Sequence, residues 1–260
     1  MEQIQNCKLY LGDCLEIMKQ IEDQSIDMIL CDLPYAVLNK NNPNAQWDKL
    51  IPFDKLWSEY ERIVKDNAAI VLFGSGMFTA DLMISNRKLW RYNLIWDKVL
   101  TSGFLNANKM PLRNHEDICV FYKNLPIYNP QMMKVDYHKR NHSKGNLQSP
   151  QKNQCYGNFK EVPTEISDEK FPKSIIEINK EHKNGCFYHP TQKPVALCEY
   201  LIKTYTNENM VVLDNCMGSG TTGVACVKTK RKFIGIKLEE KYYNIAKQRI
   251  ENETKQLELF

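Results

Sequence analysis

The segment Val211–Gly223 constrains the fold more than any other part of the chain. An apolar stretch, Val211–Leu213, runs into a glycine-rich turn with the spacing Gly-x-Gly-x-x-Gly, and a helix is predicted over Thr221–Lys228. Glycines allow a tight turn and a close approach of the backbone to a ligand, and the N–H groups at a helix start bind anionic groups. Dinucleotide-binding folds use this spacing, whereas a phosphate-binding P-loop would need Lys-Ser or Lys-Thr after the last glycine. We therefore expect an α/β unit with a ligand at its turn; the alternative is a glycine-rich turn without a ligand.

The position of this unit in the chain indicates how the sheet is assembled. Only 37 residues follow Gly223, which is room for a strand over Phe233–Ile236 and a helix over Glu239–Asn252. A nicotinamide-binding fold that began at Val211 would need several more strand–helix units after it, so we expect the other strands to come from upstream. Periodicity predicts these strands over Ile26–Cys31, Ala69–Phe73, Tyr92–Trp96 and Ile118–Tyr122. It predicts further helices over Leu15–Ile21, Phe53–Val64, Phe78–Ser85 and Pro194–Tyr205. The alternation favours a mostly parallel twisted sheet with helices on both faces.

A second motif, Asp32-Leu33-Pro34-Tyr35, follows the predicted strand Ile26–Cys31 directly. Open α/β sheets bind their ligands at the carboxyl ends of the strands, which is where this turn lies. It presents a carboxylate, backbone carbonyls and an aromatic ring, the groups that can hold an exocyclic amine on a flat heterocycle. An ordinary turn is the alternative, because the same residue types also form turns without a ligand.

Taken together, these segments resemble the permuted (β-group) amino-methyltransferases of DNA, which use S-adenosylmethionine. The matching segments, in chain order, are Gly12–Leu15, Asp32–Tyr35, His189–Pro194, Leu213–Gly223 and Phe233–Ile236 followed by Tyr242-Tyr243. The resemblance covers most of the chain except about residues 129–185. It implies a Rossmann-like methyltransferase fold with a circularly permuted motif order and a loop-rich target-recognition insertion. The implied division is a catalytic half at 1–128, a target-recognition region at 129–185, and the cofactor-binding half of the same domain at 186–260.

The resemblance also implies a catalytic role for each residue of the Asp32–Tyr35 turn. Asp32 and the backbone carbonyl of Leu33 would accept hydrogen bonds from the target amine, and Pro34 would fix the turn. Tyr35 would stack on the base, which has to be flipped out of the duplex to be reached. No Pro-Cys dipeptide occurs in the chain, which speaks against methylation of cytosine carbon 5 through an attacking cysteine.

The cofactor site implied by the resemblance is larger. Asp13 would lie near the adenine ring, the segment around Lys193 would close over the methionine moiety, and Asp214 would orient the glycine turn or meet the amino group. The residues expected to bind S-adenosylmethionine are Asp13, Asp32, Thr191, Gln192, Lys193, Asp214, Cys216, Met217, Gly218, Ser219, Gly220, Thr221, Thr222 and Lys237. His182, Cys186 and His189 are residue types that bind zinc, but His189 belongs to the cofactor-side motif, so no metal site is expected.

Two positions depart from the family pattern. Leu33 stands where the family usually has Pro, which keeps the carbonyl acceptor but leaves a less rigid turn. Lys237 stands where the family usually has an acid that binds the ribose hydroxyls, and a lysine can only donate hydrogen bonds. Glu239 or Glu240 could substitute for that acid. The alternatives that Lys237 leaves open are weak cofactor binding, an inactive domain that only binds DNA, and an NADP site, because a cation there suits a 2′-phosphate.

The stretch Asn129–Lys160 is polar, irregular and basic. It carries a net charge of +5, from Lys134, Lys139, Arg140, Lys144, Lys152 and Lys160 against Asp136. Aromatic residues are interleaved with these charges: Tyr128, Tyr137, Tyr156 and Phe159. Cationic side chains neutralise phosphates and amides read base edges, so we expect a DNA-recognition region, with a solvated loop as the alternative. Asn39–Asp48 is a second candidate for contacting the target strand.

Adenine N6 is the favoured target, because family members that act on cytosine N4 commonly carry Ser in place of Asp32. The expected partner is double-stranded DNA, with RNA not excluded; a homodimer and a restriction endonuclease partner remain open. No apolar run approaches the ~20 residues that span a bilayer. Nine cysteines without a Cys-x-x-Cys pair suggest reduced thiols and a cytoplasmic protein.

Overall fold

The computed structural model describes residues 1–36, 48–134, 168–180 and 192–258. The chain divides into two compact units, Met1–Asn129 with Lys173–Phe260 in one and Pro130–Pro172 in the other. In the described part of the second unit, β7 (Met133–Lys134) and β8 (Glu169–Lys170) pair in antiparallel orientation. Every site described below lies in the first unit.

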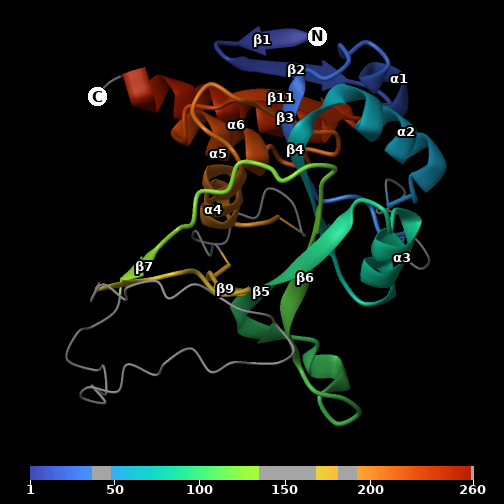
Figure 1. Cartoon of the computed structure of the whole chain (residues 1–260), viewed down its shortest axis with the longest axis vertical. Helices are drawn as coiled ribbons and strands as arrows, with labels where there is room; N and C mark the ends of the chain where they lie inside the picture. The colour runs from blue at the N-terminus through green and yellow to red at the C-terminus, as the bar shows by residue number, and fades with distance from the viewer. Residues whose placement is uncertain (37–47, 135–167, 181–191, 259–260) are drawn as a thin grey trace, which may run out of the picture. The chain divides into compact units, whose positions relative to one another are not determined.

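The first unit is built on a mixed sheet. Its strands are β1 (Glu2–Ile4), β2 (Cys7–Leu11), β3 (Ile26–Cys31), β4 (Val64–Gly74), β5 (Trp90–Ser102), β6 (Arg113–Phe121), β9 (Ile175–Glu177), β10 (Val211–Asp214) and β11 (Lys232–Lys237). Within the described residues their spatial order is β1-β2-β11-β10-β3-β4-β6-β5-β9 (Figure 1). The strands from β2 to β4 run parallel, and β6 runs antiparallel to both β4 and β5. The predicted α/β fold with a mostly parallel sheet is confirmed.

The late strand β10 lies beside the early strand β3. Val212 pairs with Met28 and Leu213 with Ile29 in parallel register. The turns that follow these two strands, at Asp32 and Asp214, therefore leave the sheet side by side at the same edge. This is the arrangement that a permuted motif order requires.

Helices cover both faces of the sheet. They are α1 (Cys14–Met18), α2 (Phe53–Ile63), α3 (Met77–Ser85), α4 (Val195–Tyr205), α5 (Thr221–Lys228) and α6 (Glu240–Glu258). Ile29 and Cys31 of β3 belong to the apolar cluster with α1, α2 and α3, whereas Met28 and Leu30 belong to the cluster with α4, α5 and α6. Because β3 is buried on both sides, its sequence is a nearly continuous apolar run.

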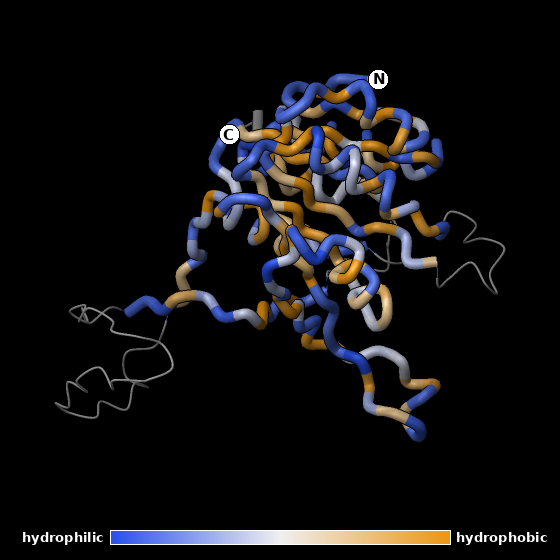
Figure 2. The backbone as a smooth tube through the Cα atoms, turned by 45° about the vertical axis from the view of Figure 1, so that its right-hand side comes forward, coloured by the Kyte–Doolittle hydropathy of each residue, from blue (hydrophilic) through white to orange (hydrophobic). Residues whose placement is uncertain are grey.

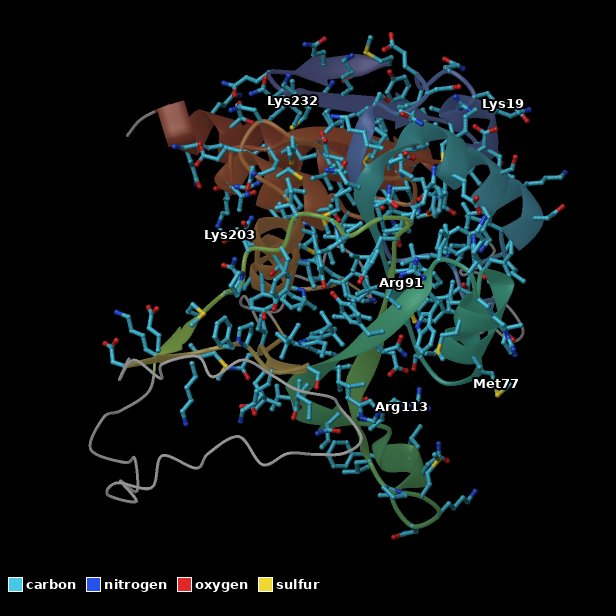
Figure 3. All side chains as sticks on the ribbon, viewed as in Figure 1. Lys19, Met77, Arg91, Arg113, Lys203 and Lys232 are labelled. Carbon is cyan, nitrogen blue, oxygen red and sulfur yellow. The ribbon has the colours of Figure 1, made fainter. Side chains whose placement is uncertain are left out.

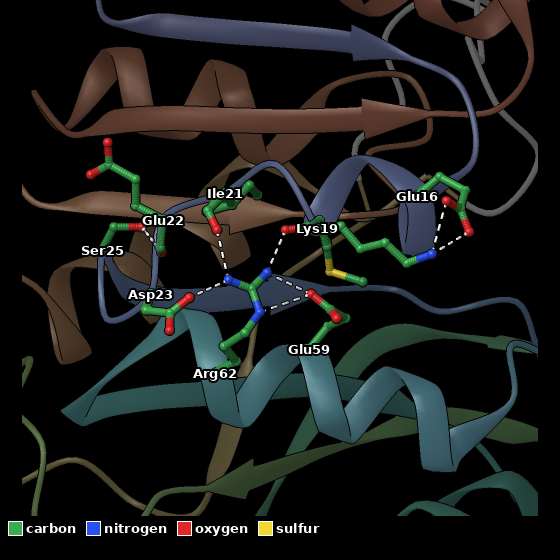
Figure 4. A network of polar contacts seen from close by, with 9 residues as sticks. Glu16, Lys19, Ile21, Glu22, Asp23, Ser25, Glu59 and Arg62 are labelled. Atoms are coloured by element: carbon green, nitrogen blue, oxygen red, sulfur yellow. Dashed lines mark hydrogen bonds and ion pairs between the residues drawn. The ribbon is translucent and has the colours of Figure 1, made fainter.

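Arg62 fastens α2 to the turn that leads into β3 (Figure 4). Its guanidinium donates to the Asp23 carboxylate at 2.5 Å, to the Glu59 carboxylate at 2.6 Å, and to the backbone carbonyls of Met18 and Ile21 at 2.8 Å each. A planar guanidinium can satisfy several acceptors at once, so one side chain holds both segments. The strand that presents Asp32 is thereby held in place against α2.

The structure differs from the sequence prediction mainly at the ends of elements. Strands β1 and β2 were not predicted, and β5 and β6 continue well beyond Trp96 and Ile118, as far as Ser102 and Arg113. The reason is that β5 and β6 remain paired through polar residues, with Asp97 opposite His115. Helix α1 ends at Met18 rather than near Ile21. No helix in the described part of the chain is long and apolar enough to cross a membrane.

Candidate functional site

A cavity of about 670 Å³ lies at the carboxyl ends of β3, β10 and β11. Its lining includes the Asp32–Tyr35 turn, the glycine turn after β10, and Asp13–Leu15 before and within α1. Cavities that hold cofactors and small ligands are commonly of this size. The two motifs that lie far apart in the sequence thus line one site.

Asp32 is held by two donors. Its Oδ2 lies 2.5 Å from Nζ of Lys193, and its Oδ1 accepts a hydrogen bond from the Tyr35 hydroxyl at 2.8 Å. Burial raises the pKa of the Asp32 carboxyl above its usual value, although the Lys193 ammonium opposes this and Glu116 adds to it. A carboxylate has about four lone-pair sites, so each oxygen can accept a further hydrogen bond from a ligand.

Lys193 also belongs to a chain of four alternating charges. Its Nζ lies 3.3 Å from Oε2 of Glu116, whose Oε1 lies 2.6 Å from Nζ of Lys98. Burial would lower the pKa of Lys193, but Asp32 and Glu116 raise it above its usual value. Burial would likewise raise the pKa of Glu116, but Lys193 and Lys98 lower it. Two carboxylates therefore face two ammonium groups, which is how buried charges are tolerated.

Glu116 and Lys98 line the cavity but were not identified from the sequence. The signal that could have found them is a charged side chain within or beside an apolar strand, since a buried charge requires a partner.

The aromatic ring of Tyr35 stacks on Phe78 of α3, with the ring centroids 4.4 Å apart. Just after it, Ala36 has a φ of 55° and donates its backbone N–H to Oδ1 of Asp48 at 2.9 Å. A left-handed backbone at a non-glycine residue is uncommon, so the Asp48 carboxylate helps hold this turn.

Asp214 organises the glycine turn from within. Its Oδ1 accepts from the backbone N–H of Cys216 at 3.0 Å, and its Oδ2 accepts from the Thr222 hydroxyl at 2.6 Å. Burial raises the pKa of Asp214 to about 6, while these two hydrogen bonds oppose the rise. Gly220 has a φ of 81°, and a Cβ there would lie 2.8 Å from Cβ of Ala246 in α6. Glycine is thus needed for both the turn and the close packing of α6.

Further hydrogen bonds tie the glycine turn to distant segments. The Ser219 hydroxyl donates to Oε1 of Gln192 at 3.1 Å, and Nη1 of Arg249 donates to the Ser219 carbonyl at 2.7 Å. The Tyr60 hydroxyl of α2 donates to Oδ1 of Asn215 at 2.5 Å. The turn is therefore braced from both faces of the sheet.

Asp13 and Lys237 lie at the end of the cavity formed by β2 and β11. Asp13 caps α1, its Oδ1 accepting from the backbone N–H groups of Leu15 at 2.8 Å and Glu16 at 3.3 Å. Lys237 is buried, and its Nζ lies 5.3 Å from the centre of the Tyr242 ring. Glu239 lines the same cavity, so a carboxylate is available beside the lysine.

Most of the predicted site residues line this one cavity. They are Asp13, Asp32, Leu33, Pro34, Tyr35, Gln192, Lys193, Asp214, Cys216, Met217, Gly218, Ser219, Thr221, Thr222 and Lys237. Gly220 directly precedes α5 as its N-cap. Thr191, the residues 39–47, most of the predicted recognition stretch Asn129–Lys160, and His182, Cys186 and His189 lie outside the described residues. Within the described ranges, no group of three or more His, Cys, Asp or Glu side chains could hold a metal ion.

Comparison with known proteins gives a consistent result. A family model described as DNA methylase matches residues 26–248. The type II methyltransferase M2.LlaDCHI of Lactococcus lactis subsp. cremoris is 28% identical over 95% of this chain and 90% of its own length. DNA adenine methyltransferase YhdJ of Escherichia coli (strain K12) is 28% identical over 92% of this chain and 81% of its own length.

Solved structures agree in fold. The M1.HpyAVI–SAM complex matches with a TM-score of 0.62 at 25% identity, covering 94% of this chain and 98% of that one. The cytosine-N4-specific PvuII DNA methyltransferase matches with a TM-score of 0.67 at 17% identity, covering 98% of this chain and 92% of that one.

Proposed function

The chain belongs to the DNA methylase family, and from that premise we propose that it transfers a methyl group from S-adenosylmethionine to the exocyclic N6 of adenine in double-stranded DNA. The chain is a DNA amino-methyltransferase that uses S-adenosylmethionine; the choice of adenine and the residue roles are the proposal. The observation that carries it is the meeting of the Asp32 turn and the Asp214 glycine turn in one cavity of about 670 Å³.

The cofactor fits the side of the cavity built by β10 and β11. The glycine turn brings backbone close to the cavity, and Asp214 fixes that turn through Cys216 and Thr222. Asp13 and Glu239 supply carboxylates at the end proposed for the adenosine moiety. When bound there, S-adenosylmethionine would supply an electrophilic methyl group.

Asp32 and the Leu33 carbonyl prepare the target amine. The lone pair of an exocyclic amine is delocalised into the ring, which makes the nitrogen a poor nucleophile. Accepting hydrogen bonds from its two N–H groups lets the nitrogen become pyramidal and frees the lone pair for attack. Lys193 keeps Asp32 ionised and oriented, because an ammonium 2.5 Å away favours the charged carboxylate. Positioning and electrostatics supply the rate, and no covalent enzyme intermediate is needed.

Two observations support adenine. Asp32 occupies the position at which family members that act on cytosine N4 commonly have Ser. A relative 28% identical over 92% of the chain is named a DNA adenine methyltransferase. The likeness to the cytosine-N4-specific PvuII enzyme is a likeness of fold at 17% identity, so cytosine N4 is the second candidate.

An inactive domain that only binds DNA is the rival from another class, and buried Lys237 is the observation that favours it. Titration of the protein with S-adenosylmethionine by calorimetry, followed by transfer of labelled methyl groups to unmethylated DNA, separates the two. Saturable heat together with labelled DNA supports the methyltransferase. Absence of heat at high cofactor concentration, together with retained DNA binding, would establish the rival.

DNA contact is proposed for two segments that lie largely outside the described residues, Asn39–Asp48 and Asn129–Lys160. Their support is sequence composition: cations that neutralise phosphates, with amides and aromatic side chains among them. A homodimer likewise remains a prediction.

A further inference from the structure

The loop that joins β5 to β6, residues 103–112, carries large apolar side chains that are exposed to solvent. Phe104 is 69% exposed, Met110 is 53% exposed, and Leu105 is completely exposed. Figure 1 shows this loop extending away from the strands β5 and β6, and Figure 2 shows hydrophobic and hydrophilic residues mixed along it. Clustered exposed apolar side chains commonly mark a binding surface.

The charge of this arm favours a polyanion. No acidic residue occurs between Asp97 and Glu116. Of the Lys and Arg residues in this interval, Lys98 is buried and paired with Glu116, which leaves Lys109 and Arg113. Lys109 and Arg113 are exposed. Cations bind DNA phosphates and apolar side chains contact bases, so the two together are typical of a surface that binds DNA.

The arm begins at the proposed active site. Ser102 and Arg113 pair across its base, and both line the cavity that contains Asp32. Nη1 of Arg113 donates to Oγ of Ser75 at 3.2 Å, which fixes the base of the arm beside the end of β4 (Figure 3). A duplex that delivers a flipped base to Asp32 therefore has to pass next to the arm.

We infer that Phe104 and Leu105 form an apolar wedge that enters the base stack of duplex DNA beside the flipped base. The inference rests on the proposed function, because it assumes that a base is brought to Asp32. Extruding a base breaks its pairing and stacking, at a cost of a few kcal/mol. Apolar side chains that insert between base steps are a known means of unstacking a duplex, and they fill the space that the flipped base leaves.

The test compares the double variant Phe104→Ala/Leu105→Ala with the wild-type protein on two duplexes that carry the mapped methylation site. In one duplex the target base is paired; in the other it faces an abasic site, so no base pair has to be broken. The double variant should lose about ten-fold or more in kcat/KM on the paired duplex and little on the abasic one. The calorimetric Kd for S-adenosylmethionine should stay unchanged. Leu125→Ala is the matched control, since Leu125 is 77% exposed beyond the other end of β6.

An equal loss of kcat/KM on both duplexes, or no loss on either, would overturn the wedge. A change in molar mass by light scattering with unchanged methylation would assign the tip to contact between protein molecules, and would also overturn the wedge.

Measuring duplex binding, without turnover, separates this inference from the proposed function. The double variant should keep the wild-type affinity for the abasic duplex and bind the paired duplex about ten-fold more weakly than the wild-type protein does, if the wedge is real. If the protein showed this binding pattern but did not methylate DNA, the wedge would stand and the proposed methyltransferase activity would be rejected.

Discussion

Nζ of Lys193 lies 2.5 Å from Oδ2 of Asp32, although the two lie 161 positions apart in the sequence. Lys193 comes from the segment that leads into α4, and Asp32 directly follows β3. The same ammonium lies 3.3 Å from Glu116 and 5.0 Å from the centre of the Phe73 ring. The contact therefore joins the proposed cofactor-binding half of the chain to the proposed catalytic carboxylate.

Replacing Lys193 by Met should move the pH dependence of methyl transfer. Without the ammonium, burial and Glu116 would raise the pKa of Asp32 further, so less of it would be ionised at neutral pH. We expect kcat/KM at saturating cofactor to fall about ten-fold or more at pH 7 and to recover partly at higher pH. Lys203→Met, at an exposed position in α4, is the control. A loss of equal size at every pH would contradict this role for Lys193.

Asp32→Ala should abolish methyl transfer while leaving binding largely intact. The substitution removes the acceptor for the target amine, but it leaves the glycine turn and the Asp214 hydrogen bonds in place. We expect a saturable calorimetric titration with S-adenosylmethionine and a retained gel shift with DNA, without labelled product. Normal turnover by this variant would show that Asp32 is not the catalytic carboxylate.

Binding of the cofactor's ribose hydroxyls should depend on Glu239, because Lys237 cannot accept a hydrogen bond. Glu239→Gln should weaken S-adenosylmethionine binding about ten-fold, because charge-assisted hydrogen bonds are replaced by neutral ones. The neighbouring Glu240→Gln serves as the matched control. Calorimetric Kd values that are the same for both variants would mean that another group binds the ribose.

Asp214 should make the stability of the protein depend on pH. Its pKa in the folded protein is about 6 against an ordinary value of 3.8, so the native state holds this proton more tightly than the unfolded state does. The contribution is present below pH 4 and is lost as the pH rises through 6, by about 3 kcal/mol in the free energy of unfolding. Urea unfolding of the wild-type protein and of Asp214→Asn should therefore give a difference that changes between pH 4 and pH 6. A constant difference across that range would contradict the raised pKa.

The sequence predicted those parts of the site whose position follows from topology alone. Parallel strands place their carboxyl ends at one edge, so Asp32 and Asp214 could be expected together once both strands were recognised. The apolar runs of β3 and β10 made that recognition possible, because buried parallel strands are apolar on both faces.

The site residues that the sequence does not predict depend on pairing between distant segments. Glu116 enters the site because β6 continues, through polar residues, back to Arg113, and such a continuation has no apolar pattern to predict it. Strand β2 has a weak signal in the sequence, because Cys7 and Leu9, which are buried, alternate with the more exposed Lys8 and Tyr10. The strand is too short and too polar for this alternation to predict it.

The most direct test of the proposed adenine methylation is mass spectrometry of nucleosides from unmethylated DNA incubated with the purified protein and S-adenosylmethionine, with Asp32→Ala in parallel. We expect N6-methyladenine from the wild-type protein and none from the variant. N4-methylcytosine would contradict the choice of base, and no methylated base at any cofactor concentration would contradict the proposed activity itself.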